Sequence, residues 1–273
     1  MTAEAAENGW PLEDRGAAFG DGLFETVLVR DGAPLLWEQH LARLARGCRM
    51  LGISLPAREH LERPLVDAGE GLSVLKLILT RGSGGRGYAL PDTSEPRLRW
   101  RLAPFMPSPE RWRRGVRVRH CRLRLGIQPA LAGLKHLNRL ENVLARAEWS
   151  DDDTAEGLLS DSEGRLVEAT CMNLFWQRDG ILETPRLDRC GVAGTLRTVL
   201  LDRLPIREVD AFPQLLEQVE ALWLGNSLQG VWPVAWLDDA QGRAVQRWSI
   251  GPQHRRLQAV AHDALGFPSR LDD

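Results

Sequence analysis

Lysine is almost absent from this chain, because only Lys76 and Lys135 interrupt a set of 35 basic residues that is otherwise arginine. An amine can lose its proton and act as a nucleophile or a base, whereas a guanidinium stays charged at any pH that a protein meets. A lysine kept in such a sequence favours amine chemistry, such as a Schiff base with a carbonyl compound. Lys135 is the main candidate, and a surface lysine at a helix start is the alternative. For Lys76 the wetter face of a strand is the simpler interpretation.

Two further charged residues stand among apolar neighbours. Arg43 lies on an otherwise apolar helix face in the pattern H-x-x-R-L. It either extends its charged end to solvent or binds a phosphate with two parallel hydrogen bonds. Glu168 lies between Val167 and Ala169 in a predicted strand. Its carboxylate either sits on a solvated sheet face or has a functional role.

Two glycine-containing segments could approach an anion. In GVAGTLRTVLL the amides of Gly194, Thr195 and Leu196 would open a helix, where unpaired N–H groups and the helix dipole favour an anion. An ordinary helix cap is the alternative. TRGSGGRGYALPD carries Arg86, which can hold a carboxylate with two hydrogen bonds, and Tyr88, the only tyrosine of the chain. A flexible surface hairpin with incidental Arg and Tyr is the alternative there.

Strand-like and helix-like patterns alternate in the first hundred residues. Phe24–Trp37 predicts two short strands around an Asp31-Gly32 turn. The segment 38–53 repeats apolar residues as an amphipathic helix does and should stop near Gly52. Branched residues in 71–82 favour a strand.

The stretch APFMPSPERW separates two predicted domains. Its prolines neither extend a helix nor donate to a sheet ladder, so it is interpreted as a linker at 105–112. The domains are then residues 1–104, small, and residues 113–273, larger. Strands and helices mixed in this order predict an α/β (α+β) fold with a largely antiparallel or mixed sheet.

The second half supplies the elements around the candidate residues. KHLNRLENVLARAEW repeats apolar residues as a helix over 135–149 that starts at Lys135. The run 157–183 predicts three consecutive strands, and 190–204 a helix opened by glycine. The run 221–239 predicts strand, loop and strand.

The composition restricts the partners. Of 273 residues, 43 % are hydrophobic and 26 % charged, and the net charge of −2 argues against nucleic acid or an anionic membrane surface. The scattered cysteines have no zinc-site spacing, so no metal site is predicted. The start of the chain shows no secretory pattern and no run reaches the ~20 apolar residues of a membrane span. These features predict a cytoplasmic protein.

Four segments carry a resemblance to a known family. FGDGLFET, KHLNRLENVLARA, VEATCMNLF and CGVAGTLR resemble, in the same order, motifs of the fold-type IV pyridoxal-phosphate enzymes. This family includes branched-chain and D-amino-acid aminotransferases and 4-amino-4-deoxychorismate lyases. The similarity runs from about Asn8 to about Val234. It implies a two-domain fold with a small mixed-sheet N-terminal domain, a larger C-terminal domain carrying the lysine, pyridoxal 5'-phosphate as cofactor, and a homodimer.

The resemblance also implies roles for individual residues. Lys135 would hold the cofactor covalently, Arg43 would bind its phosphate, and Glu168 would face its pyridine nitrogen. A carboxylate there keeps the nitrogen protonated and improves the ring as an electron sink. Asn173 matches a family position and is expected to support strand geometry.

The phosphate end departs from the aminotransferase pattern. Where those enzymes often have a threonine hydroxyl, this chain has Leu196, so the backbone around Gly194 or the side chain of Thr195 must serve instead. In the loop LGNSLQGVWPV, Asn226 and Ser227 match a segment that supplies another phosphate hydroxyl, with Ser227 the better candidate.

The run RGSGGRGY resembles the lyase group of the family more than either aminotransferase group. This implies cleavage of 4-amino-4-deoxychorismate to 4-aminobenzoate and pyruvate, a step of folate biosynthesis, with Arg86 and Tyr88 binding this small-molecule substrate. An aminotransferase of the same fold is one alternative. A non-catalytic binding protein that kept the fold is the other.

Overall fold

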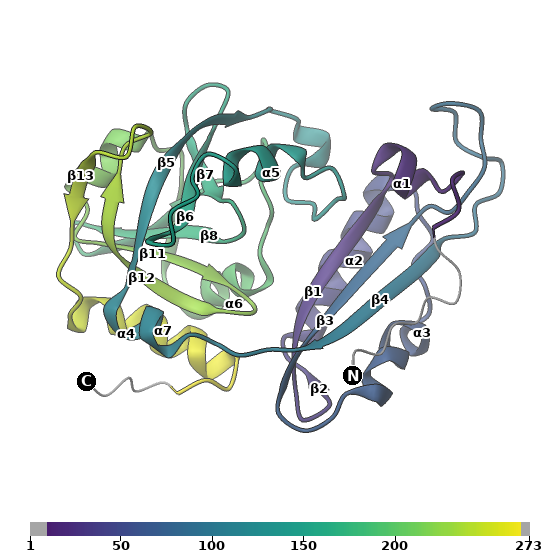
Figure 1. Cartoon of the computed structure of the whole chain (residues 1–273), viewed down its shortest axis with the longest axis horizontal. Coiled ribbons are helices and arrows are strands. Elements are labelled where there is room, and N and C mark those ends of the chain that lie inside the picture. Colours follow the sequence, from purple (N-terminus) through teal and green to yellow (C-terminus); the bar gives the residue numbers. More distant parts are fainter. Residues whose placement is uncertain (1–9, 269–273) are drawn as a thin grey trace. The chain divides into compact units, whose positions relative to one another are not determined.

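The computed structural model describes residues 10–268 and divides the chain into two compact units (Figure 1). One unit runs to Met106 and includes Leu134–Asn138, and the other holds the rest of the chain. The division after Met106 falls inside the predicted linker 105–112, but helix α4 (Pro109–Arg114) starts within that linker. A proline suits the first turn of a helix, where its missing N–H needs no partner. Residues 1–9 and 269–273 lie outside the described residues, so the expectation that the start of the chain has no secretory pattern stays a prediction.

The first unit is built on a four-stranded antiparallel sheet in the order β2-β1-β3-β4. The predicted hairpin is confirmed, because Asp31 (φ 49°) and Gly32 (φ 79°) form the turn between β1 and β2. The predicted strand around Lys76 is confirmed as β3. The strands are β1 (Gly22–Arg30), β2 (Ala33–Pro34), β3 (Leu72–Thr80) and β4 (Arg97–Pro104).

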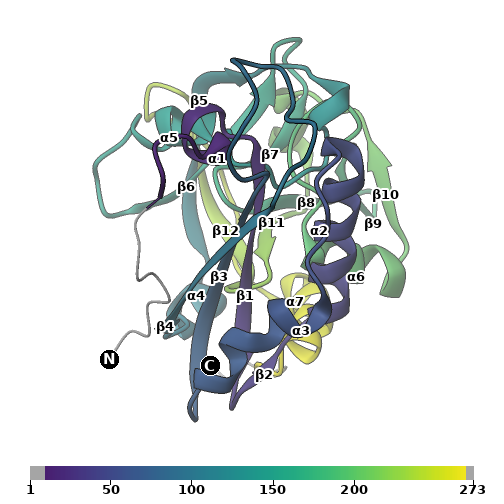
Figure 2. The same cartoon turned by 90° about the vertical axis from the view of Figure 1, so that its right-hand side faces the viewer.

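Helix α2 (Trp37–Leu51) packs on this sheet (Figure 2). It ends as predicted at Gly52, whose φ is 63°. Because successive strand residues point to opposite faces, Leu23, Glu25 and Val27 share a face of β1, and the two apolar ones belong to the core that α2 completes. Glu25 is therefore directed into an apolar layer. The remaining helical segments of this unit are α1 (Arg15–Phe19), α3 (Arg58–Glu62) and the 3-10 turn η1 (Arg63–Asp67).

The second unit contains a nine-stranded mixed sheet. Eight strands follow the order β10-β9-β8-β11-β12-β5-β6-β7, and β13 pairs with β12. Three pairs are parallel, namely β9 with β10, β12 with β5 and β5 with β6. The predicted mixed α/β fold is confirmed. The strands are β5 (Val116–Leu125), β6 (Thr154–Asp161), β7 (Leu166–Ala169), β8 (Asn173–Arg178), β9 (Ile181–Pro185), β10 (Ile206–Val209), β11 (Ala221–Asn226), β12 (Gly230–Asp238) and β13 (Ala244–Arg247).

The prediction of three strands over 157–183 was one strand short. The middle strand is split into β7 and β8, because the N–H of Ala169 donates to the carbonyl of Met172 at 2.8 Å and closes a turn. The helix predicted over 190–204 is found as α6 (Thr195–Arg203), which begins five residues later than predicted. The predicted strand, loop and strand over 221–239 are confirmed as β11, a short loop and β12.

The helix predicted over 135–149 is much shorter in the structure. It is α5 (Leu140–Arg146), and the apolar residues Leu140, Val143 and Leu144 are 68 %, 61 % and 54 % exposed. The other helical segments of this unit are α6 (Thr195–Arg203), α7 (Pro252–Ala264), η2 (Pro129–Leu131) and η3 (Pro213–Gln218). Among residues 10–268 no helix is both long enough and apolar enough to cross a membrane.

Candidate active site

Lys135 lies on an extended segment and not at a helix start, so that part of the prediction was wrong. The N–H of Phe24 donates to the carbonyl of Lys135 at 2.9 Å, and the N–H of Leu137 donates to the carbonyl of Gly22 at 3.0 Å. These bonds attach the segment to β1 of the first unit and use groups that a helix would have needed. The Lys135 Nζ lies 4.3 Å from the centroid of the Phe24 ring. Strand pairing thus fixes the backbone from which the amine projects.

Arg43 is held by a carboxylate within the first unit. Its Nε donates to Glu25 Oε1 at 2.8 Å and its second terminal nitrogen donates to Glu25 Oε2 at 2.5 Å. The ring nitrogen Nδ1 of His40 lies 2.6 Å from the same Oε2. The side chain of Arg43 is 10 % exposed, so it does not extend freely into solvent. A bidentate pair of this kind fixes the plane of the guanidinium.

The charges in this cluster set its protonation. Burial alone would raise the pKa of Glu25, but the charge of Arg43 and hydrogen bonds from Arg43 and His40 lower it to about 2. Burial lowers the pKa of His40, the attraction of Glu25 opposes this, and the positive charges of Arg43 and Lys135 lower it further. The cluster at neutral pH is therefore a carboxylate, a guanidinium and a neutral imidazole whose Nδ1–H donates to Glu25.

Glu168 is buried in β7, at 4 % exposure, so the alternative of a solvated sheet face is not what the structure shows. Its Oε2 accepts from the N–H of Val192 at 2.9 Å. Asn173 donates from Nδ2 to the carbonyl of the same Val192 at 2.9 Å. The two side chains therefore bind the N–H and the carbonyl of the same residue, Val192. Asn173 thus supports the segment at Val192, whereas the sequence led us to expect that it supports strand geometry.

The segment after Val192 leads into the opening of α6. The N–H of Gly133 donates to the carbonyl of Gly191 at 2.9 Å, and the N–H of Ala193 donates to the carbonyl of Gly133 at 3.2 Å. A Cβ on Gly194 would lie 1.9 Å from Asn173 Oδ1, so only glycine fits there. The first turn of α6 therefore starts at a position that bears no side chain.

Thr195 and Leu196 both lie in the first turn of α6 and are buried. Leu196 is 1 % exposed and apolar, so only its backbone could serve an anion. The first N–H groups of a helix have no carbonyl four residues before them within the helix, and the helix dipole favours negative charge at this end. The geometry suits a phosphate bound by backbone amides, with Thr195 as the hydroxyl in that turn.

Ser227 lies in the turn between β11 and β12, where it is half-buried. The neighbouring Asn226 already has structural partners: its Oδ1 accepts from the N–H groups of Leu228 and Gln229 at 3.0 and 2.7 Å. Its Nδ2 donates to the carbonyl of Cys171 at 3.3 Å. Asn226 therefore shapes the turn in which the hydroxyl of Ser227 lies.

Arg86 and Tyr88 are exposed on a loop of the first unit that connects β3 and β4. Lys76 on β3 is also exposed, in agreement with the wetter sheet face, and its Nζ lies 5.9 Å from the Phe24 ring centroid.

Three residues of the candidate site were missed from the sequence. Glu25 stands in the apolar strand GLFETVLV, and this interruption by a charged residue is its signal in the sequence. His40 precedes Arg43 by three residues, one turn of α2, and its imidazole could have been paired with that guanidinium. Arg139, which precedes α5, is half-buried. Burial lowers its pKa, and the charges of Glu168 and Glu141 oppose this.

The residues present fit pyridoxal phosphate. An aldehyde needs an amine, which Lys135 of the first unit supplies. A pyridine nitrogen needs a carboxylate, and Glu168 of the second unit is buried and held in place by the N–H of Val192. A phosphate needs donors, which the side-chain-free opening of α6 and Ser227 supply.

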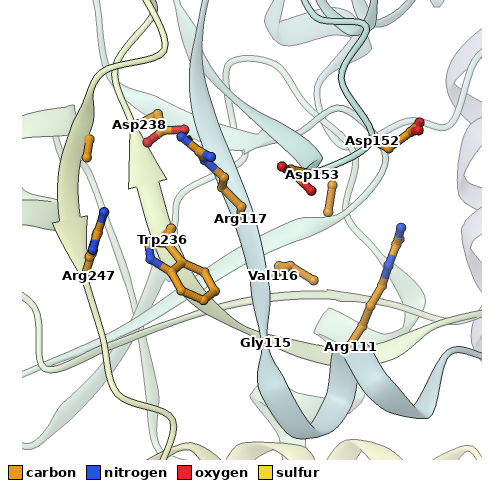
Figure 3. A pocket seen from close by; sticks show the side chains of 11 residues that line it. Arg111, Gly115, Val116, Arg117, Asp152, Asp153, Trp236, Asp238 and Arg247 are labelled. Atoms are coloured by element: carbon orange, nitrogen blue, oxygen red, sulfur yellow. Dashed lines mark hydrogen bonds and ion pairs between the residues drawn. The ribbon is translucent and has the colours of Figure 1, made fainter.

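A pocket of about 410 Å³ on the second unit contains none of the candidate residues (Figure 3). It is lined by Trp236 and by charged side chains of both signs, among them Arg117 and Asp238, which form an ion pair at 2.5 Å. Its own charges therefore largely neutralise one another, and it is separate from the candidate active site.

Comparison with known proteins gives consistent matches over nearly the whole chain. Residues 22–237 match the family model described as amino-transferase class IV. The chain is 34 % identical to an aminodeoxychorismate lyase from Vibrio harveyi, over 91 % of this chain and 94 % of that protein. It is 46 % identical to the structure of 4-amino-4-deoxychorismate lyase from Pseudomonas aeruginosa, with a TM-score of 0.86, over 98 % of this chain and 100 % of that one. A hypothetical aminotransferase from Mycobacterium tuberculosis in a PLP-bound form shares the fold, with a TM-score of 0.77 and 21 % identity.

Acid should destabilise the protein through His40 and Glu25. The pKa of each is lowered in the folded protein from 6.5 and 4.5, respectively. The unfolded chain therefore binds more protons as the pH falls, first at His40 below about pH 6.5 and then at Glu25 below about pH 4.5. The unfolding free energy of the wild type should therefore fall as the pH is lowered from about 7 to 5. His40→Gln lacks the titrating group, so its unfolding free energy should fall less steeply, by up to about 1.4 kcal/mol per pH unit. Urea unfolding at several pH values measures this slope.

The control for that measurement is His60→Gln, which alters an exposed imidazole of the same unit. It should follow the wild-type slope. Parallel curves for His40→Gln and the wild type would show that the buried imidazole is not the group that titrates.

Proposed function

We propose that this chain, which belongs to the class IV aminotransferase family, is a lyase converting 4-amino-4-deoxychorismate into 4-aminobenzoate and pyruvate. Members of the family use pyridoxal phosphate. The observation that carries the proposal is the similarity, at 46 % and 34 % identity, to two lyases of this name over more than nine-tenths of the chain. The loop RGSGGRGY, which resembles the lyase group, supports the same choice.

We propose that Lys135 holds the cofactor through its side-chain amine and that Arg43 binds the phosphate. The amides of Gly194, Thr195 and Leu196 and the hydroxyls of Thr195 and Ser227 would complete the phosphate contacts, and Glu168 would hold a proton on the pyridine nitrogen. When bound, the cofactor supplies an electron-withdrawing ring next to the substrate carbon. The Glu25 pairing with Arg43 keeps one guanidinium plane, which suits a fixed phosphate.

The proton transfer falls to Lys135. With the cofactor and substrate bound, the amine of Lys135 would take the proton from the ring carbon that bears nitrogen. The carbon–oxygen bond to the enolpyruvyl group then breaks, and a proton returned to the departing fragment gives pyruvate. The remaining ring becomes aromatic, so the atoms balance without water or an oxidant. Because aromatisation supplies much of the driving force, the chain's main tasks are positioning and proton transfer.

We also propose a homodimer located in the cytoplasm. Support for the dimer comes from Leu140, Val143 and Leu144, an apolar row on α5 that is more than half exposed in the single chain. A contiguous exposed apolar row of this kind is typical of a protein interface. Analytical ultracentrifugation of the purified protein measures the assembly directly.

The reaction type is tested with the purified holoenzyme and 4-amino-4-deoxychorismate alone. Pyruvate and 4-aminobenzoate should appear in equal amounts without any 2-oxo-acid acceptor, because the elimination needs no second substrate. Lactate dehydrogenase with NADH follows the pyruvate. Turnover that needs a 2-oxo acid and transfers the amino group would instead favour an aminotransferase. A colourless protein without either activity would favour a non-catalytic binding protein.

Arg86 is proposed to hold a substrate carboxylate, with Tyr88 beside it. Arg86→Ala removes a charge-assisted contact of about 1.5–3 kcal/mol and should raise KM about 10- to 150-fold. The visible absorption of the cofactor should stay unchanged. Steady-state kinetics measures the effect, with Arg46→Ala, an exposed arginine on α2, as the control. An Arg86→Ala enzyme with the wild-type KM would remove Arg86 from the substrate site.

A further inference from the structure

The loop that carries Arg86 has a backbone that only glycine can adopt at several positions. Gly82, Gly84, Gly85 and Gly87 have φ values of 89°, 114°, 79° and 58°. A Cβ would lie 2.0 Å from the carbonyl oxygen of Glu95 at Gly82, and 2.2 Å from that of Ala89 at Gly85. The glycines therefore permit one close-packed loop conformation, and do not serve only to make the loop flexible.

Arg15 lies beneath this loop and is 4 % exposed. One terminal nitrogen of its guanidinium donates to the carbonyls of Gly84, Gly87 and Ala89, at 3.2, 3.1 and 3.2 Å. The other lies 3.4 Å from the carbonyl of Tyr88. Four loop carbonyls thus converge on one buried cation, and one of them belongs to Gly87, which lies between Arg86 and Tyr88.

The cation itself is fixed from the other side. Its Nε donates to Asp21 Oδ2 at 2.9 Å, and its guanidinium carbon lies 5.1 Å from the centroid of the Phe19 ring. The Phe19 ring is in turn 5.4 Å from the ring of Tyr88. Arg15 therefore joins the loop to helix α1 and to the turn before β1. A lysine could not reproduce this, because a single ammonium lacks the planar fork of five N–H donors.

We propose that Arg15 is a positioning residue for substrate binding: it holds the glycine loop in the conformation that presents Arg86 to a carboxylate of the substrate. This rests on the proposed function. Fixing the loop before the substrate arrives removes the entropic cost of ordering its backbone on binding. The effect of Arg15 should therefore be expressed in KM and through Arg86.

The chain offers a matched control in Arg81, which is also 4 % exposed and donates from Nε to the same Asp21 oxygen at 2.8 Å. Its terminal nitrogens donate to the carbonyls of Gly52 and Leu51, at the end of α2, and none of its hydrogen bonds within the described residues goes to residues 84–89. Replacing either Arg15 or Arg81 therefore removes a buried guanidinium from Asp21, but only replacing Arg15 removes contacts to the loop.

The experiment compares Arg15→Lys with Arg81→Lys as holoenzymes. Arg15→Lys should raise the KM about tenfold, as a loss of about 1.4 kcal/mol does, with kcat and cofactor absorption close to wild type. Arg81→Lys should keep the wild-type KM. In an Arg86→Ala background, Arg15→Lys should add no further increase in KM. The proposal would be overturned if Arg15→Lys raised KM by the same factor in the wild-type and Arg86→Ala backgrounds. It would also be overturned if Arg15→Lys left the wild-type KM unchanged.

A second readout does not need the substrate. Trypsin can cut after Arg86, and peptide mass spectrometry should find this cleavage about tenfold faster in Arg15→Lys than in Arg81→Lys, because the freed loop enters the protease more often. Gly85→Ala should have the same effect with Arg15 intact, and it serves if Arg15→Lys does not fold. Equal cleavage rates in all variants would contradict a role of Arg15 in holding the loop. Failure of the wild-type protein to release pyruvate would contradict the proposed function and leave the cleavage result valid.

Discussion

The structure depends on two backbone hydrogen bonds that attach a five-residue segment to β1. The N–H of Phe24 binds the carbonyl of Lys135, and the N–H of Leu137 binds the carbonyl of Gly22. The segment groups with the first unit, yet both of its chain neighbours, Gly133 and Arg139, belong to the second. Gly133 is in turn paired with the peptide that Glu168 and Asn173 hold. The position of the amine is therefore determined by strand pairing on one side and by covalent continuity on the other.

Arginine has a structural use in the first unit that lysine could not take over. Arg15 and Arg81 share the carboxylate of Asp21, Arg97 pairs with Asp14, and Arg43 forms a double contact with Glu25. Arg15 and Arg81 also bind several backbone carbonyls at once, as only a guanidinium fork can. An amine cannot replace these arginines, just as a guanidinium cannot replace a lysine that must lose a proton.

Local patterns predicted the parts of the fold that local chemistry determines. The Asp31-Gly32 turn and the end of α2 at Gly52 are confirmed, because each uses a glycine with a positive φ. The helix preceded by Gly194 is also found, and there a glycine is needed because a Cβ would meet Asn173. The extended segment at Lys135 could not be predicted in this way. Its partner Leu23 is more than a hundred residues distant in the chain, and the helical spacing of its neighbours carries no information about that pairing.

The same limit applies to the site. The apolar spacing predicted that Leu140, Val143 and Leu144 share one face of a helix. It did not predict that other residues of the same chain leave this face exposed. Resemblance selected Arg43 and Glu168, whereas the contacts of Glu25 with His40 and Arg43 became visible only when the fold brought β1 and α2 together. Their importance lies in long-range contacts between charged groups, which a single sequence does not display.

The most direct test of the account is the location of the covalent link. The purified yellow holoenzyme is reduced with borohydride and digested, and mass spectrometry identifies the peptide that carries the pyridoxyl group. The account predicts that this group is on Lys135, and that Lys135→Ala lacks both the visible absorption and the lyase activity. A pyridoxyl group on Lys76, or an alanine variant that remains coloured and active, would contradict it.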